Sequence, residues 1–114
     1  MTIREVKETL NAEVFAGEVH LDREIRAACA SDLMSDVLAF VKDQSLLLTG
    51  LLNLQTIRTA DMMDIICIVF VRGKKPDATM IELANKRDIV LMTTGLRMYP
   101  ASGKLYKNGL IGVD

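Results

Sequence analysis

A basic patch after an apolar run is the feature of this sequence best suited to bind an anion. Arg72-Gly73-Lys74-Lys75 directly follows the apolar run Ile65 to Val71 and is the only dense basic patch in the sequence. A glycine between the cations lets a phosphate or carboxylate group approach the backbone closely. The alternative is a solvated turn before Pro76. The patch therefore predicts either a local anion site or an exposed turn.

Small and polar residues follow the other strand-like runs in the same way. Thr49 and Gly50, for example, come directly after the apolar run Leu46 to Leu48. The carboxyl ends of parallel strands meet at one edge of a sheet, beside helix N-termini, and ligands bind in the crevice there. The predicted ligand-binding residues are, in chain order, Ser31, Asp32, Thr49, Gly50, Asn53, Arg72, Gly73, Lys74 and Thr94.

Several of these residue types also have ordinary structural uses. Ser31 and Asp32 are both common helix caps, which is the alternative to a ligand role. A lone glycine such as Gly50 is also used where a turn needs its geometry. Arg58 is expected to pair with Asp61 at the i, i+3 spacing of a helix, unless it turns toward the crevice. The ligand roles therefore depend on how the loops meet.

The sequence lacks the residue groups that support catalysis. A phosphate-binding loop of the type Gly-x-x-x-x-Gly-Lys-Ser/Thr is absent, because Leu105 follows Gly103-Lys104 and Met98 stands at the first glycine position. His20 has no other metal ligands at suitable spacing and no Gly-x-Ser-x-Gly motif to serve. We therefore expect no catalytic residue, no metal and no cofactor.

Composition narrows the class of protein further. The 114 residues suit one domain, and half of them are hydrophobic, which predicts a packed core. Lys and Arg number 14 against 15 Asp and Glu, so no global field attracts nucleic acid or anionic lipid. The longest apolar runs are too short to span a membrane, and the charged N-terminus does not resemble a signal peptide. Cys29 and Cys67 each stand alone, which indicates reduced, buried thiols and a cytoplasmic protein.

The first third of the chain reads as a helix, a β-rich section and a second helix. Thr2-x-x-Glu5 is a capping-box pattern that predicts a helix ending near Asn11. Ser31 is expected to cap the second helix. Short β-prone pieces are predicted at Ala12 to Phe15, Val19 to Leu21 and Ile25 to Ala30, and the second helix carries Leu33, Met34, Val37, Leu38 and Val41.

The rest of the chain alternates between apolar runs and helical patterns. Continuous apolar runs bounded by turn residues are typical of parallel strands covered on both faces. Strands are predicted at Leu46 to Thr49, Ile65 to Val71 and Ile89 to Met92, with helices at Leu54 to Met63 and Asp77 to Lys86. A last helix between Thr94 and Gly109 is expected to start late or to kink, because Pro100 and Gly103 interrupt it. The pattern predicts an α/β fold with a mainly parallel central sheet and helices on both faces.

Several stretches together resemble a small stand-alone protein of the DRTGG-domain family. These stretches are Ala30 to Val37, Thr49 to Asp61, Val69 to Pro76, Thr93-Thr94 and Gly103 to Tyr106. The resemblance covers nearly the whole chain, and Val71-Arg72-Gly73-Lys74-Lys75-Pro76 is its most specific part. After Leu48 the loop reads Thr-Gly-Leu-Leu-Asn in place of Asp-Arg-Thr-Gly-Gly. Ligand contacts of the family's named motif therefore do not carry over to this loop.

The resemblance implies a fold and a role. Relatives include a domain that precedes the transferase part of some phosphotransacetylases, a domain found beside CBS pairs, and the N-terminal domain of HPr kinase/phosphorylase, which shares the fold. The implied role is regulatory or related to assembly. The resemblance thus implies that residues 1–114 form a single DRTGG-like domain.

Three functional hypotheses follow. The leading one is a non-catalytic regulatory module that forms a homodimer and senses a small anionic metabolite or nucleotide. The second is a structural or protein-interaction subunit without a ligand, in which an exposed apolar surface binds a protein partner. The third is a small phosphate-handling enzyme that uses Asp32, Asp61 or Asp64 with the basic loop, and it requires two carboxylates to converge near a cleft.

Overall fold

The computed structural model describes residues 1–40 and 44–112. Their elements are, in order, α1 (Ile3–Leu10), β1 (Glu13–Ala16), the 3-10 helix η1 (Glu18–His20), β2 (Ala27–Ala30), α2 (Met34–Phe40), β3 (Ser45–Thr49), α3 (Leu54–Met62), β4 (Cys67–Phe70), α4 (Ala78–Lys86), β5 (Val90–Thr93) and α5 (Met98–Lys107). No helix in this part of the chain is long and apolar enough to cross a membrane.

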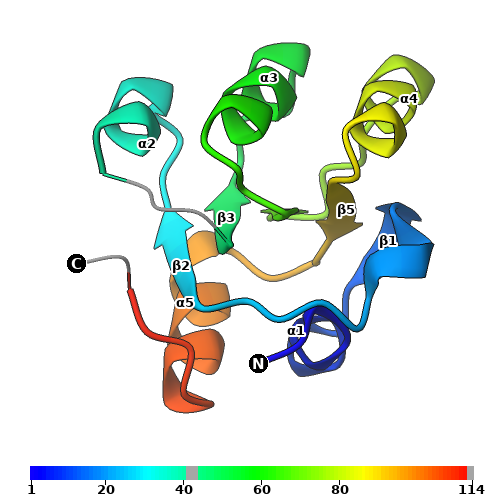
Figure 1. Ribbon diagram of the computed structural model, residues 1–114. Coiled ribbons are helices and arrows are strands. Elements are labelled where there is room, and N and C mark those ends of the chain that lie inside the picture. The colour runs from blue at the N-terminus through cyan, green and yellow to red at the C-terminus, as the bar shows by residue number, and fades with distance from the viewer. Residues whose placement is uncertain (41–43, 113–114) are drawn as a thin grey trace.

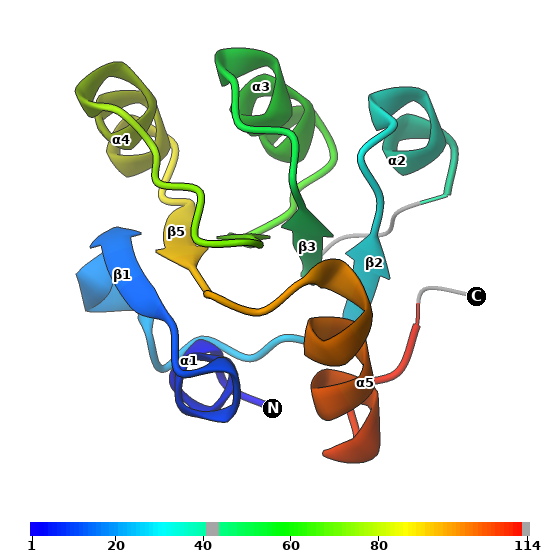
Figure 2. The same cartoon turned by 180° about the vertical axis from the view of Figure 1, so that it is seen from behind.

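The strands form one mixed sheet with helices on both faces. Its strand order is β1-β5-β4-β3-β2, in which β2 to β5 are parallel and β1 is antiparallel to β5. Helices α2, α3 and α4 cover one face, and α1 and α5 cover the other (Figures 1 and 2). The predicted α/β fold with a mostly parallel sheet is confirmed, with one antiparallel pair at the edge.

The core has one layer on each face of the sheet, because successive strand residues point to opposite sides. Leu48, Val69 and Met92 are paired across β3, β4 and β5 and pack toward α1 and α5. The next residue back in each strand packs toward the opposite layer, so Leu47, Ile68 and Leu91 meet α3 and α4. Burial on both faces explains why these strands read as continuous apolar runs.

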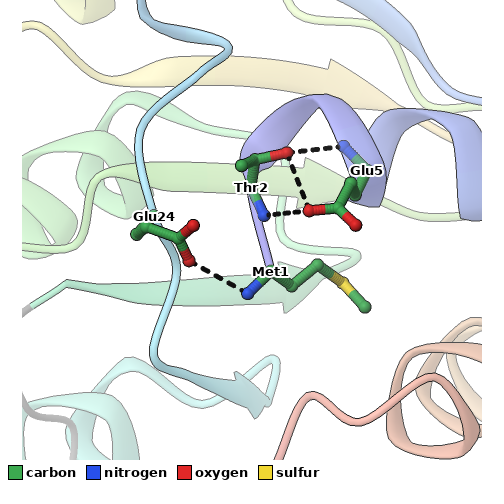
Figure 3. Close-up of polar contacts among 4 residues, drawn as sticks. All are labelled: Met1, Thr2, Glu5 and Glu24. Atoms are coloured by element: carbon green, nitrogen blue, oxygen red, sulfur yellow. Dashed lines mark hydrogen bonds and ion pairs between the residues drawn. The ribbon is translucent and has the colours of Figure 1, made fainter.

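The first helix begins with the predicted capping box. The Thr2 backbone N–H donates to the Glu5 carboxylate at 2.9 Å, and the Glu5 backbone N–H donates to the Thr2 hydroxyl at 3.1 Å (Figure 3). The Thr2 backbone N–H, and after it the Thr2 hydroxyl, which donates to the same carboxylate at 3.2 Å, hold the pKa of Glu5 below its usual value. The Met1 amine also lies 3.1 Å from the Glu24 carboxylate, which joins the start of α1 to the segment before β2.

A short segment at the β2 edge covers part of that edge. The Ala28 backbone N–H donates to the carbonyl of Ile111 at 2.9 Å, and Ala28 forms a parallel bridge with Gly112. Residues 110–112 therefore run beside β2 after α5 has ended, on the side of β2 away from β3.

The predicted strand at Val19 to Leu21 is wrong. This segment contains η1, a single 3-10 turn in which the His20 N–H donates to the Gly17 carbonyl at 2.9 Å. Gly17 has a φ of +77°, which turns the chain out of β1. Val19 is 89% exposed, so its β-branched side chain does not pack in a sheet as the predicted strand required.

The second helix begins later than predicted. Ser31 does not cap it, because the Ser31 hydroxyl accepts the N–H of Leu33, a residue that still precedes the helix. Val37 is fully buried as expected, whereas Leu33 and Leu38 are exposed. Val41 lies outside the described residues.

The last helix runs through both residues that were expected to interrupt it. Pro100 is the third residue of α5, where a backbone N–H would have no partner within the helix anyway. Gly103 lies mid-helix and faces open space. The fixed φ of proline therefore fits the first turn. Helix α5 begins at Met98, four residues after Thr94, so it starts late as expected, and it continues without a break to Lys107.

Candidate functional site

The chain leaves β4 and β5 toward opposite faces of the sheet. The loop after β4 leads to α4 on one face, and the loop after β5 leads to α5 on the other. Such a point is where α/β sheets usually open a ligand crevice. Here the two loops are tied together, because the Arg72 N–H donates to the Leu96 carbonyl at 2.8 Å and the Gly73 N–H to the Thr94 carbonyl at 2.9 Å. The accessible surface therefore lies to one side, toward β3.

Five of the nine predicted residues meet there, and we name them the strand-end cluster: Asp32, Thr49, Gly50, Arg72 and Lys74. The Asp32 carboxylate accepts the Gly50 N–H at 2.6 Å and the Thr49 hydroxyl at 3.0 Å. The Lys74 ammonium donates to the Gly50 carbonyl at 2.7 Å. Loops after β2, β3 and β4 are thus joined at Gly50.

Gly50 carries no side chain where the Arg72 guanidinium lies. A Cβ atom at Gly50 would be 2.7 Å from Nη2 of Arg72 and 3.5 Å from the nearer Asp32 oxygen. Arg72 has a φ of +61° and Gly73 a φ of +70°, so two consecutive left-handed residues turn the loop back over β3. The guanidinium therefore lies across the Gly50 backbone, beside the Asp32 carboxylate.

The other four predicted residues have hydrogen bonds within the framework. Asn53 caps α3 by accepting the N–H of Thr56 at 3.0 Å, and Ser31 forms the turn before α2. The Gly73 N–H already bonds the loop after β5. Thr94 is 0% exposed, and its hydroxyl donates to the Leu10 carbonyl at 2.8 Å. A ligand on the surface has no Thr94 atom to touch.

We predict that Thr94→Val lowers the free energy of unfolding by about 1–3 kcal/mol, because it leaves the buried Leu10 carbonyl without this donor. The change keeps the side-chain shape, so packing should be preserved. Urea unfolding followed by circular dichroism measures the loss. A neutral substitution would show that the Leu10 carbonyl finds another donor.

The charges of the strand-end cluster favour an anion. Arg72 and Lys74 carry two positive charges against the single negative charge of Asp32. The structure shows no hydrogen bond or ion pair for the exposed Arg72 side chain with any described residue. The Gly50 N–H, in contrast, is already taken by Asp32. The arrangement therefore offers an anion a guanidinium and the remaining N–H groups of Lys74, while the backbone donor at Gly50 is occupied.

The carboxylates considered for catalysis do not converge. Asp61 and Asp64 lie at the opposite edge of the sheet, around a hollow of about 340 Å³ before β4 and β5 that Arg87 also lines. Asp61 pairs with Arg87 at 3.7 Å, so the expected pairing with Arg58 is wrong. Among the described residues no three His, Cys, Asp or Glu side chains are placed to hold a metal ion.

Thr93 was not among the predicted ligand-binding residues, but it contributes to the framework of this region. Its hydroxyl donates to the Lys74 carbonyl at 2.7 Å and so fixes the backbone that carries the lysine. The predicted strand ended at Met92, and nothing in the sequence distinguished Thr93 from its neighbour Thr94. Of the two predicted buried thiols, Cys67 is buried, which raises its pKa, whereas Cys29 is half-buried.

The fold is similar to that of a solved structure. That structure is the regulatory region of Clostridium perfringens pyrophosphatase, comprising CBS and DRTGG domains, complexed with the activator diadenosine tetraphosphate. It matches with a TM-score of 0.77 at 19% sequence identity, over 99% of this chain and 48% of that one. The fold of this chain is therefore similar to that of part of the CBS and DRTGG domains in that structure. This chain spans about half of the matched chain, and at this identity the likeness concerns the fold alone.

Neither a protein-family model nor a curated protein sequence matches the chain. The likeness to the pyrophosphatase regulatory region agrees with a DRTGG-like fold on structural grounds.

Proposed function

We propose that this chain is a single DRTGG-like domain that acts as a non-catalytic regulatory module and binds a small anionic metabolite or nucleotide at the strand-end cluster. The observation that carries the proposal is the Arg72 guanidinium lying exposed across Gly50, beside Lys74. Guanidinium groups bind phosphate and carboxylate through two parallel hydrogen bonds, which makes these the favoured ligand groups.

The surrounding loops support this site. The Gly50 N–H donates to Asp32, and the Gly50 carbonyl accepts a hydrogen bond from Lys74, so both backbone groups of Gly50 are held in place. The Thr93 hydroxyl holds the Lys74 backbone in the same way. On ligand binding, only the Arg72 side chain then has to lose conformational freedom. A preorganised site of this kind has a low entropic cost of binding, which favours affinity. Nucleotides enter the proposal through the pyrophosphatase regulatory region, whose activator is a dinucleoside tetraphosphate.

A regulatory role fits the site better than catalysis. The Asp32 carboxylate in the cluster accepts hydrogen bonds from Thr49 and Gly50. The other two carboxylates considered for catalysis, Asp61 and Asp64, lie at the opposite end of the strands.

We propose in addition that the protein is cytoplasmic and that it self-associates as a homodimer. A second candidate function is a protein-interaction subunit without a ligand, which the exposed tyrosines Tyr99 and Tyr106 favour.

The experiment is a thermal-shift screen of nucleotides, inorganic phosphate and carboxylate metabolites, followed by calorimetric titration of any compound that stabilises the protein. We predict that Arg72→Gln weakens binding by roughly 1–3 kcal/mol, because a charge-assisted contact is lost. Lys75→Gln is the matched control. Lys75 is the neighbouring exposed cation, but it pairs with Glu13 on β1 at 3.7 Å.

Both variants remove one positive charge, so a general electrostatic effect would weaken binding equally. A loss confined to Arg72→Gln supports the site. Unchanged affinity in Arg72→Gln, or equal losses in both variants, would remove the strand-end cluster as the binding site. If no compound stabilises the wild-type protein, the interaction-subunit alternative is preferred.

A further inference from the structure

The outward face of α5 is apolar, open and regular. Tyr99 is 89% exposed and Tyr106 is 71% exposed, while Ala101 and Leu105 on the opposite side of the helix are buried in the core. Gly103 lies between the tyrosines on the same face, since positions three and four apart are neighbours on a helix. No described atom lies near the place where its Cβ would be. The two rings therefore flank a shallow hollow of about 670 Å³ along the helix.

We propose that this face binds a second copy of the chain, with the two α5 helices antiparallel and crossing near Gly103 about a two-fold axis. The proposal rests on the self-association included in the proposed function and names the surface responsible. It does not depend on the strand-end cluster, whose Gly50 and Arg72 belong to loops after β3 and β4.

The pattern along α5 is self-complementary. A two-fold interface requires that residue i of one copy meet residue j of the other and the reverse. With the crossing at Gly103, Tyr99 lies four residues before the axis and Lys107 four residues after it. An antiparallel pair therefore sets the Tyr99 ring of each copy against the Lys107 ammonium of the other, a cation–π contact. Lys104, the other cation that lines the hollow, lies opposite Ser102 of the partner copy in this register.

The small residue at the centre allows the close approach that the crossing needs. Glycine lacks a Cβ, so the two helix backbones can approach closely at this point, as small residues allow in other helix pairs. In the same register the Tyr106 ring of each copy lies opposite Pro100 of the other, and both residues line the hollow. A bulky side chain at position 103 would hold the helices apart and leave the rings in water.

The available area suits a dimer of modest affinity. An aromatic side chain buries on the order of 150–250 Å². Two tyrosines from each copy thus supply roughly 600 Å² or more, which is over half of the ~1,000 Å² that marks a specific interface. Pro100 and the methylene groups of Lys104 and Lys107 line the same hollow and add to it. We expect reversible association in the micromolar range.

The first test measures self-association by sedimentation equilibrium from about 1 μM to about 1 mM. We predict that wild type forms dimers and that Tyr106→Glu weakens dimerisation at least tenfold, because it places a carboxylate in the apolar centre. Val19→Glu is the matched control, since Val19 is also an exposed apolar residue and lies on η1, away from α5. Circular dichroism checks that both variants remain folded.

The second test places a cysteine at the proposed axis. Gly103→Cys should form an intermolecular disulfide under mild oxidation, because a disulfide needs Cα atoms within ~7 Å. Val19→Cys should not. A wild-type monomer at every concentration would overturn both the interface and the proposed self-association. Dimers that persist in Tyr106→Glu, or Gly103→Cys that fails to cross-link, would overturn this interface while leaving self-association in place.

Discussion

Phe70→Ala is expected to lower the free energy of unfolding by about 3–5 kcal/mol, the usual cost of removing a buried aromatic ring from a core. Phe70 is 0% exposed in β4, and its ring lies in the core layer formed with α3 and α4. It is paired with Thr49 on β3 and Thr93 on β5, so small side chains flank it and cannot fill the space. Small domains have about 5–15 kcal/mol of stability in total. The variant should therefore be close to unfolding at room temperature.

Urea unfolding measured by circular dichroism tests this prediction. Phe15→Ala provides a matched control, because it deletes the same ring from the edge strand β1, where Phe15 is only partly buried. Its loss should be clearly smaller. Equal losses in the two variants would show that the layer under α3 and α4 is not the dominant source of stability.

Gly17→Ala should cost about 2–4 kcal/mol, from left-handed backbone strain together with overpacking. Gly17 has a φ of +77°, and a Cβ there would lie 2.9 Å from both Cα and Cγ2 of Val90. The Val90 Cα belongs to β5, which is hydrogen-bonded between β1 and β4, and it cannot move without disturbing that pairing. To relieve the close contact between an alanine Cβ at position 17 and Val90, β1 and η1 would have to shift instead.

Gly73→Ala is the control that separates strain from contact. Gly73 has a similar φ of +70°, but nothing lies within 4 Å of its missing Cβ. It should lose only about 1–2 kcal/mol, the strain of a left-handed residue. Thermal unfolding of both variants gives the comparison. A loss at Gly73 as large as at Gly17 would mean that the contact with Val90 is relieved easily.

The parallel part of the fold could be predicted because its signal is local. Leu46, Ile68 and Leu91 are each buried on one face of the sheet, and their neighbours are buried on the other, so whole runs are apolar. The η1 turn could not be predicted, because the β-branched Val19 suggested a strand while the Gly17 backbone conformation decided the outcome. Pro100 suggested an interruption of the last helix. The effect of a proline depends on its place, however, and in the first turn of α5 its fixed φ fits the helix.

The candidate site was predicted only in part. Sequence order placed Gly50, Arg72 and Lys74 at one edge of the sheet, and they do meet there. It could not show that Asp32 would accept the Gly50 N–H, because that hydrogen bond joins loops 18 residues apart. Nor could it show that Thr94 would be buried against Leu10, since the contact depends on where α1 packs. Long-range partners decide which loop groups remain available.

The segment beside β2 has a consequence for solubility. Strand β2 ends the sheet, and its residues Ala27 to Ala30 have small, mostly apolar side chains that would not deter another strand from pairing there. An uncovered edge of this kind is a template for aggregation. The hydrogen bond from Ala28 to Ile111 occupies its middle. Addition of a further strand at the β2 edge is thereby obstructed.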